Sequence, residues 1–363
     1  MKIIFLCVLV LLFGCAAPTP PPTPSPTSAP PAPTEINLPA PAGVIVVADN
    51  LLQPRGLTFG PDGSLYIAEA GISPPPGQNA ANSGRITKIA PDGTRTVVLD
   101  QIANTGSEFN GALGPNATAF ISDTLYLATS APDGGRGNAK SGVYRVNADG
   151  STELIADLGE FNDAHKPRYI DVDYDRANPY DMVALDGKLY MTDGNIQVIN
   201  EVDPSAPIGQ NTRRVADMSR GHPVLTGIVA GKDGNLYVTE FTHGPYSEAF
   251  SEHVAKIYRV TVDGEVTVIA DGITMALGLA QAPEGTFYAT QFASDLDPKG
   301  NFTAPGSIVK LRAGDSNVTT VVPNLAYPTG IEMGPDGYLY FANYGITIPW
   351  NGQQRGVVYK MKP

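Results

Sequence analysis

The chain has 363 residues, and its 24 Lys and Arg stand against 36 Asp and Glu, which gives a formal net charge of −12. Hydrophobic residues make up 42% of the chain and charged residues 17%, which excludes a wholly disordered polyelectrolyte. Acidic composition without basic clusters also argues against nucleic acid as a partner, because phosphates require Lys and Arg. Glycine (39 residues) and proline (33 residues) are both abundant, and this excess indicates frequent turns.

Residues 1–14 have the form of an export signal. Lys2 supplies a positive charge, and the apolar run that follows, residues 3–13, is too short to span a bilayer, since a spanning helix takes about 20 residues. The sequence LFGC at 12–15 resembles the lipobox of bacterial lipoproteins, whose cysteine is acylated and becomes the mature N-terminus. We therefore expect Cys15 to carry a lipid that holds an exported protein on the extracytoplasmic side of a membrane. An ordinary secretory signal followed by an incidental cysteine is the alternative.

Residues 15–42 are predicted to be a disordered tether. Eleven prolines between residues 18 and 42 alternate with Thr, Ser and Ala, so this stretch lacks the large apolar groups of a core. Such sequences favour extended polyproline conformations of about 3.1 Å per residue. A spacer between lipid and domain fits this position better than a proline-rich ligand for a recognition domain does.

From residue 43 to residue 363 one motif recurs six times. In each copy a Leu or Phe precedes a Tyr in a strand-like segment, with a Gly/Asp turn such as GPDG at 60–63 just upstream. Another apolar strand comes before the turn and one or two more follow, so each unit reads as a four-stranded antiparallel meander. The six tyrosines are Tyr66, Tyr126, Tyr190, Tyr237, Tyr288 and Tyr340.

Six such units of about 50 residues predict an all-β, six-bladed β-propeller with almost no α-helix. The last unit ends at 356–361 after only three strands, and GVIVVAD at 43–49 resembles the missing fourth. The N-terminal strand is therefore expected to complete the last blade and close the ring, which hides edges that otherwise pair with other chains. We expect a monomer.

Loop lengths indicate the face of the ring on which ligands bind. Turns between strands one and two, and between three and four, are mostly short and share one face, whereas the other face carries the long loops. Binding residues usually lie on long loops held by a rigid scaffold, so we place the candidate site at the channel mouth on that face. The long loops are residues 70–84, 101–114, 158–178, 241–254 and 292–305.

Two rings of residues are expected to surround the channel. The first is formed by the starts of the innermost strands and the second by the polar residues that end the Leu-Tyr strands. Recognition of a polar ligand is one interpretation, and bonds to loop backbone groups and internal water are the other. The candidate ligand-binding residues are Arg55, Asn116, Tyr180, Asp181 and Glu240, with Glu69 and Thr226 as further members of the rings.

Motifs of hydrolases and metal sites are incomplete in the sequence. DVDYDR at 171–176 resembles the start of a calcium loop, but Arg176 and Met182 stand where an EF-hand needs Gly and Glu, so a solvated acidic loop is the favoured interpretation. No HExxH pair and no G-x-S-x-G elbow occurs. We therefore assign no catalytic residue.

The order of the blade motifs, from GLTFGPDGSLYIAEAG to PTGIEMGPDGYLYFANYG, resembles the ScyD/ScyE family of exported six-bladed propellers. The resemblance implies fold and compartment but no established activity. The single GPDGxLY motifs are shared with propellers of the NHL and gluconolactonase type, so a lipid-anchored binding or scaffolding module is favoured and a metal-dependent lactonase is the alternative. Its cofactor would be a divalent cation such as calcium, with Asn116 and Asp181 at comparable positions and Glu69 or Glu240 as the third ligand. For the binding module, we expect the partner to be a small molecule or an envelope protein.

Overall fold

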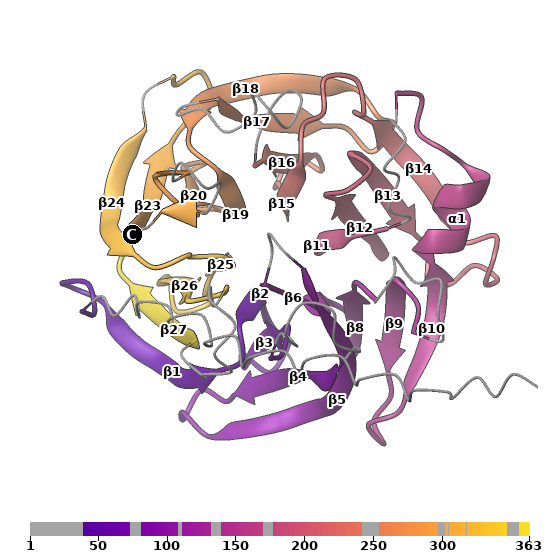
Figure 1. Cartoon of the computed structure of the whole chain (residues 1–363), viewed down its shortest axis with the longest axis horizontal. Helices are drawn as coiled ribbons and strands as arrows, with labels where there is room; N and C mark the ends of the chain where they lie inside the picture. Colours follow the sequence, from indigo (N-terminus) through magenta and orange to yellow (C-terminus); the bar gives the residue numbers. More distant parts are fainter. Residues whose placement is uncertain are drawn as a thin grey trace, which may run out of the picture. The chain divides into compact units, whose positions relative to one another are not determined.

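A computed structural model describes residues 39–72, 81–107, 111–131, 139–169, 177–241, 254–296, 302–303, 305–316, 318–346 and 356–363. These residues form a six-bladed β-propeller whose blades surround a central axis (Figure 1). The sequence-based prediction of the fold is confirmed, including four antiparallel strands in each blade.

The first three blades follow the repeats in chain order. Blade 1 contains β2 (Pro54–Phe59), β3 (Leu65–Glu69), β4 (Ala81–Ile89) and β5 (Arg95–Ser107), to which a short β6 (Gly111–Leu113) is added. Blade 2 contains β7 (Pro115–Ile121), β8 (Thr124–Thr129), β9 (Gly142–Val146) and β10 (Thr152–Asp157). Blade 3 contains β11 (Pro179–Leu185), β12 (Lys188–Asp193), β13 (Val198–Val202) and β14 (Thr212–Asp217).

The last three blades complete the ring. Blade 4 contains β15 (Leu225–Ala230), β16 (Leu236–Glu240), β17 (Ala255–Val260) and β18 (Val266–Ile273). Blade 5 contains β19 (Ala276–Gln281), β20 (Phe287–Gln291), β23 (Gly306–Leu311) and β24 (Thr319–Leu325), with a separate pair formed by β21 (Asp295–Leu296) and β22 (Phe302–Thr303). Blade 6 contains β25 (Ile331–Met333), β26 (Leu339–Asn343), β27 (Gly356–Met361) and β1 (Ile45–Leu51).

Ring closure takes place as the sequence predicted. Strand β1 pairs antiparallel with β27, with Ile45 opposite Lys360 and Leu51 opposite Gly356. The first strand of the chain is thus the outermost strand of the last blade. Because Ile45 lies at the end of β27 that faces the short turns, the chain enters the ring on the short-turn face.

In the turns GPDG at 60–63, GKDG at 231–234 and GPDG at 334–337 an aspartate side chain accepts a hydrogen bond from the backbone. Asp62 accepts a hydrogen bond from the backbone N–H of Ser64 at 3.0 Å, and Gly63 adopts a φ of 74°, which favours glycine. Asp336 accepts from the N–H of Tyr338 at 3.2 Å in the corresponding turn of blade 6. The same local chemistry therefore shapes hairpins at opposite ends of the sequence.

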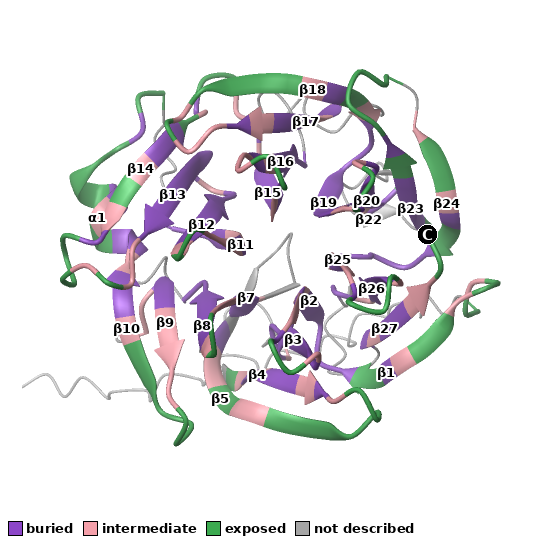
Figure 2. Cartoon of the chain, turned by 180° about the vertical axis from the view of Figure 1, so that it is seen from behind, coloured by how far each residue is buried: buried purple, intermediate pink, exposed green. Residues whose placement is uncertain are grey.

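The hydrophobic core lies between neighbouring blades. Inner strands are buried and outer strands are largely exposed, as Figure 2 shows by colour. The inner strands approach one another so closely that a Cβ atom on Gly56 would lie 2.7 Å from the carbonyl oxygen of Asn116. Close packing of this kind explains why glycine or alanine recurs there in five of the six blades.

One short helix is described, which agrees with the expectation of almost no α-helix, and it lies in the segment 158–178 that the sequence predicted to be a long loop. Helix α1 (Leu158–Ala164) follows β10, and the side chain of Asp157 caps it by accepting from the N–H of Glu160 at 2.9 Å. Asp157 and Glu160 form the spacing of a capping box, a signal that the strand-based reading of the sequence missed. Within the described ranges, no helix combines the length and apolar character that crossing a membrane requires.

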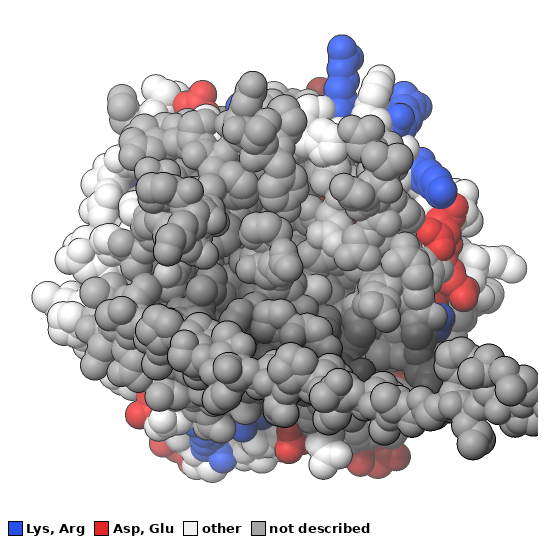
Figure 3. Space-filling view, in the orientation of Figure 1, with Lys and Arg blue, Asp and Glu red and all other residues white. Residues whose placement is uncertain are grey.

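Basic and acidic side chains lie near one another around the rim of the propeller in the view of Figure 3. Ion pairs between partly exposed side chains occur on the described surface, such as Arg145 with Glu153 at 2.8 Å and Lys88 with Asp62 at 2.6 Å. Exposed pairs of this kind contribute little to stability.

Candidate functional site

The central channel contains a cavity of about 300 Å³ that is lined by the inner strands. Its lining combines apolar residues, such as Leu57 and Ile331, with polar residues such as Thr58 and Thr118. The lining extends to the ends of the inner strands on the short-turn face, where the side chains are partly exposed. These end residues are Phe59, Phe120, Ala184 and Ala230.

Two carboxylic acids, Asp181 and Glu332, enter this cavity from opposite blades. They come from β11 and β25 and are the charged side chains among the described residues that line it. Asp181 accepts hydrogen bonds from the N–H groups of Met182 (2.9 Å) and Ile228 (3.1 Å). Glu332 accepts from the N–H of Met333 at 3.2 Å. The acids therefore bind backbone groups, and no lysine or arginine lines the cavity among the described residues.

Burial raises the pKa values of both acids. Removal from water raises the pKa of Asp181 to about 7, although its two backbone hydrogen bonds act in the opposite direction. Burial, together with the nearby charge of Asp181, raises the pKa of Glu332 to about 8. At neutral pH the pair therefore holds at least part of its protons, and a bound cation would allow both groups to ionise.

The channel narrows at the end that faces the long loops. Arg55, Asn116, Tyr180 and Asp181 line a space of about 20 Å³, which has room for about one water molecule. The side chains of Arg55 and Tyr180 are hydrogen-bonded, and burial raises the pKa of Tyr180 to about 12 and lowers that of Arg55. The structure thus brings four of the predicted ligand-binding residues together, but in a constriction rather than in an open mouth.

Other members of the first ring connect neighbouring blades. Asn116 donates to the carbonyl oxygen of Pro179 at 2.8 Å, and Thr226 donates to that of Ala276 at 2.9 Å. Thr329 does the same across the closure of the ring, to Pro54 at 2.7 Å. Each acceptor directly precedes the ring residue of the next blade. These bonds match the structural interpretation of the ring, since they satisfy buried backbone carbonyls.

The glutamates of the second ring bind groups of their own blades or of the segment that leads into the blade. Glu69 accepts from the N–H of Leu52 at 2.5 Å and forms a two-bond ion pair with Arg85 at 2.9 and 2.8 Å. Glu240 is fully buried and binds Lys256 at 3.0 Å and the hydroxyl of Tyr258 at 2.7 Å. Neither glutamate is among the residues that line the channel cavity.

Two further members of the second ring accept hydrogen bonds from backbone N–H groups of the segments that precede their blades. Asp193 accepts from the N–H of Asn178 at 3.1 Å, and Gln291 accepts from the N–H of Thr274 at 2.9 Å. Burial raises the pKa of Asp193 to about 6, while hydrogen bonds from backbone N–H groups act against this shift. In blades 1, 3 and 5 the residue that ends the second strand thus accepts a hydrogen bond from the segment that precedes the blade.

A calcium site of the kind that the lactonase alternative implies does not fit the described residues. Glu69 and Glu240, the two candidates for the missing ligand, already bind cationic side chains in their own blades. Among the described residues, no three His, Cys, Asp or Glu side chains gather closely enough to hold a metal ion. The acidic loop at 171–175 and two of the four histidines, His243 and His253, lie outside the described residues.

Glu332 was not singled out from the sequence. It lies three residues after the ring position Thr329, where the other blades carry small or apolar residues. An alignment of the six copies would have identified Glu332, because it is the one acid at a position where the other five copies carry uncharged residues. The equivalents are Thr58, Ala119, Val183, Val229 and Ala280.

Comparison with known proteins supports the fold. No family model matches the chain, and no curated protein sequence matches it significantly. A gluconolactonase from Xanthomonas campestris shares 14% identity and a TM-score of 0.55, with 88% of this chain and 89% of that chain covered. A putative glucose dehydrogenase from Thermus thermophilus gives 17% identity and a TM-score of 0.56, covering 87% and 98%.

A third similar structure is regucalcin from Agrobacterium tumefaciens, described as a calcium-binding protein. It shares 15% identity and a TM-score of 0.53, and 88% of this chain and 93% of that chain are covered. All three likenesses support the β-propeller fold. At such low identity they describe the fold, and the resemblance to the ScyD/ScyE family continues to rest on the sequence motifs.

Proposed function

We propose that this protein is an exported, lipid-anchored binding module whose ligand site is the channel cavity. The observation that carries the proposal is the pair of carboxylic acids, Asp181 and Glu332, in a channel cavity of about 300 Å³ that has no lysine or arginine among its described lining residues. The ligand that suits this chemistry is a compact aliphatic amine. Its ammonium group pairs with the acids, and its alkyl part contacts apolar walls such as Leu57 and Ile331.

Electrostatics favour a cation over a neutral ligand. An ionised carboxylate in an apolar cavity is unfavourable unless an opposite charge accompanies it. Burial is the main cause of the raised pKa values of Asp181 and Glu332. These values therefore indicate that the ionised form of each acid lacks a compensating positive charge. A bound ammonium ion stabilises the ionised carboxylates and so lowers both pKa values. Binding is therefore expected to release protons near neutral pH.

Binding of two probe amines tests the proposal. Methylammonium and 1,4-diaminobutane are titrated into the full chain at pH 7.5 and at pH 5.5, with the melting temperature and calorimetric heat as readouts. We expect a rise in melting temperature at pH 7.5 that is greatly reduced at pH 5.5, where the acids hold their protons. Glu332→Gln is expected to weaken binding at least tenfold, and the exposed Glu153→Gln should bind as wild type.

Absence of amine binding at both pH values, or equal binding by Glu332→Gln, would overturn the assignment of this cavity. A second substitution, Asp181→Ala, keeps the test decisive if one variant folds poorly. Melting temperatures without amine identify such a variant.

The membrane anchor is a separate part of the proposal and rests on LFGC at 12–15 and on the proline-rich segment that follows. Incorporation of a labelled fatty acid into the full chain tests it in an expressing bacterium, with Cys15→Ser as the variant and Cys7→Ser as the matched control. Loss of label in Cys15→Ser alone is expected. Label that persists in Cys15→Ser would contradict the anchor but leave the channel proposal intact.

A lactonase activity is the alternative function. The likeness of the fold to a gluconolactonase motivates it, and Asn116 and Asp181 both line the channel constriction. Against it stand the engaged carboxylates of Glu69 and Glu240. Elemental analysis of the purified chain and an assay of gluconolactone hydrolysis separate the alternatives, and metal-dependent hydrolysis abolished by Asp181→Ala would favour the lactonase.

A further inference from the structure

The mouth of the channel cavity on the short-turn face differs in chemistry from the interior. In each blade one residue of the inner strand lies opposite the Leu or Phe that precedes the repeated tyrosine, at the short-turn end of the strand. In blades 1 to 4 this residue lines the cavity. We call these four residues the collar, and they are Phe59, Phe120, Ala184 and Ala230.

The collar is accessible and uncharged. All four residues are partly exposed, so a molecule in the mouth can contact them. None of their side chains carries a hydrogen-bonding group, so a polar group held against them would lose water without gaining a partner. The collar therefore favours an apolar part of a ligand. The turns that follow the inner strands are all described, at residues 60–64, 122–123, 186–187, 231–235, 282–286 and 334–338.

Two aromatic rings give one side of the collar a fixed shape. The ring of Phe59 packs against that of Tyr340 in blade 6 with centroids 4.9 Å apart and an edge-to-face geometry. The ring of Phe120 packs in the same way against Tyr66 in blade 1, also at 4.9 Å. Such pairs hold both rings in place. Blades 3 and 4 contribute only methyl groups to the collar, which leaves room for an alkyl chain beside the rings.

The carboxylic acids lie deeper than the collar. Asp181 precedes Ala184 by three residues in β11, and a strand rises about 3.3 Å per residue, so roughly 10 Å separates the two levels. Glu332 precedes the collar level in β25 by one residue. Both acids are partly exposed. When the ammonium group of a ligand reaches Asp181 from the short-turn face, the chain attached to it therefore lies along the collar.

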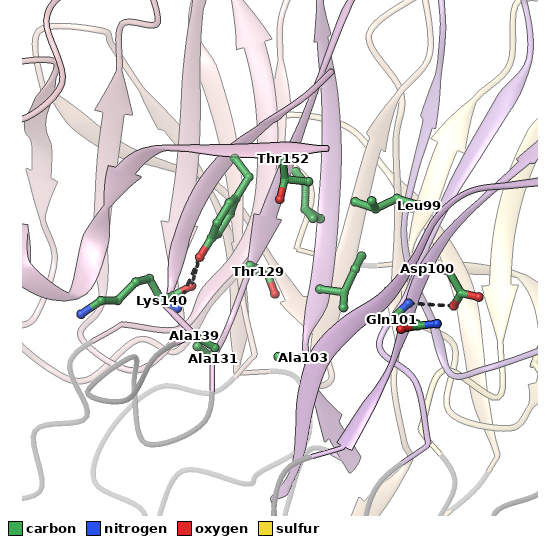
Figure 4. A pocket seen from close by; sticks show the side chains of 12 residues that line it. Leu99, Asp100, Gln101, Ala103, Thr129, Ala131, Ala139, Lys140 and Thr152 are labelled. Carbon is green, nitrogen blue, oxygen red and sulfur yellow. Dashed lines mark hydrogen bonds between the residues drawn. The ribbon is translucent and has the colours of Figure 1, made fainter. Parts of the chain in front are cut away.

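An apolar mouth is not a general feature of cavities in this chain. The pocket of about 240 Å³ between β5 and blade 2 has Asp100, Gln101 and Lys140 among the described residues that line it, together with Thr129 (Figure 4). At the level of the collar, the described lining of the channel contains no charged or amide side chain. The channel thus combines acids in its interior with an apolar surface at its mouth.

We propose that the channel site is selective for primary amines with an extended alkyl chain, whose ammonium group pairs with Asp181 and Glu332 and whose chain lies along the collar. The inference rests on the proposed function of the channel and adds the class of ligand to it. The cavity of about 300 Å³ is large enough, because an engineered cavity of about 150 Å³ holds benzene, which has as many carbon atoms as a hexyl chain.

Two probe amines separate this inference from the proposed function. n-Propylamine and n-hexylamine are titrated into the full chain at pH 7.5, with calorimetric heat and melting temperature as readouts. Each methylene that leaves water strengthens binding by up to about fourfold, so hexylamine should bind at least about tenfold more tightly than propylamine. Equal binding of the two amines would overturn the inference and leave the proposed function standing, whereas binding of neither would overturn both.

A double variant, Ala184→Asn with Ala230→Asn, places amide groups on the collar. We expect it to bind hexylamine and propylamine with nearly equal affinity, because its amides would be desolvated by the longer chain. Its affinity for propylamine should stay within about twofold of wild type, since the acids are unchanged. Ala206→Asn is the matched control, because Ala206 is also partly exposed but does not line the cavity, and it should keep the preference for hexylamine.

Phe120→Ala is the second variant, which keeps the test decisive if the double variant does not fold. Loss of the ring removes apolar surface from the collar, so the preference for hexylamine should fall by about threefold. Melting temperatures without amine show which variants are folded. An unchanged preference in a folded collar variant would overturn the inference.

Discussion

Glu69 and Glu240, at the ends of β3 and β16, differ from Asp181 and Glu332 in the channel chiefly in the charges around them. The two blade-end glutamates are fully buried and each binds a basic side chain. The two channel acids bind backbone N–H groups, and burial raises their pKa values. Acids of the propeller therefore have two kinds of surroundings: a neutralised acid holds the structure together, and an acid without a cation beside it is the group to which we assign the proposed ligand.

The largest effect is expected from Glu69→Ala, which removes the acceptor for Arg85 and for the N–H of Leu52. Breaking one partner of a buried ion pair is destabilising by about 3–5 kcal/mol, since it leaves an uncompensated charge. Urea denaturation measures the loss. Glu153→Ala, which breaks an exposed pair with Arg145, is the matched control and should change stability by less than about 1 kcal/mol. Equal losses in the two variants would remove the distinction between buried and exposed acids.

Glu240→Gln is expected to have a smaller effect of the same sign. The amide oxygen still accepts from Tyr258, but Lys256 loses its charged partner and is itself partly exposed. We expect a destabilisation of about 1–3 kcal/mol. Thermal denaturation at pH 7 provides the measurement, and the exposed Glu265→Gln serves as the control. A stability equal to that of the wild type would show that this pair is not needed.

Glu332→Gln is expected to change stability in the opposite direction. Between the pKa of an unfolded glutamate, near 4.3, and the folded pKa of about 8, the folded protein holds more protons than the unfolded chain, so its stability falls as pH rises through this window. The amide cannot ionise. The variant should therefore be more stable than wild type by about 1–2 kcal/mol at pH 8 and should gain little near pH 4. A loss of stability at pH 8 would show that ionised Glu332 stabilises the fold, as Glu69 and Glu240 do.

The smallest effect concerns hydroxyl groups with and without partners. Thr329→Val removes the bond to the carbonyl of Pro54 at the ring closure and should lower stability by about 1 kcal/mol. Thr129→Val removes a buried hydroxyl for which the described residues provide no hydrogen-bond partner, and it should leave stability unchanged or slightly raised. Chemical denaturation of both variants measures the difference. Equal losses would show that the hydroxyl of Thr129 is already satisfied.

The number of blades and the order of their strands could be predicted from the sequence, because both depend on local signals that repeat along the chain. In blades 1, 4 and 6 the Leu-Tyr strand follows a turn in which an aspartate, such as Asp62 or Asp336, accepts a backbone hydrogen bond, and these signals act over a few residues. The three-strand last unit and the spare strand at 43–49 also predicted the closure by β1 and β27. Helix α1 was missed because a seven-residue helix leaves a short pattern.

The site was predicted only in part, because it depends on partners far apart in the chain. Arg55, Asn116, Tyr180 and Asp181 do meet, as equivalent positions of a ring must. The sequence could not reveal that Glu332 shares a cavity with Asp181, since that neighbourhood exists only when blades 3 and 6 face each other across the closed ring.

By itself, the sequence determined the number of blades, the order of strands and the places where residues of one kind recur, because each follows from periodicity and turn chemistry. The tertiary structure decided what each recurring residue does. Glu69 and Thr129 occupy the same position of the repeat, yet one is held by Arg85 and the other lines the pocket between β5 and blade 2. The physical reason is that a side chain's charge state and bonding depend on its neighbours in space, and the ring assembles these neighbours from different blades.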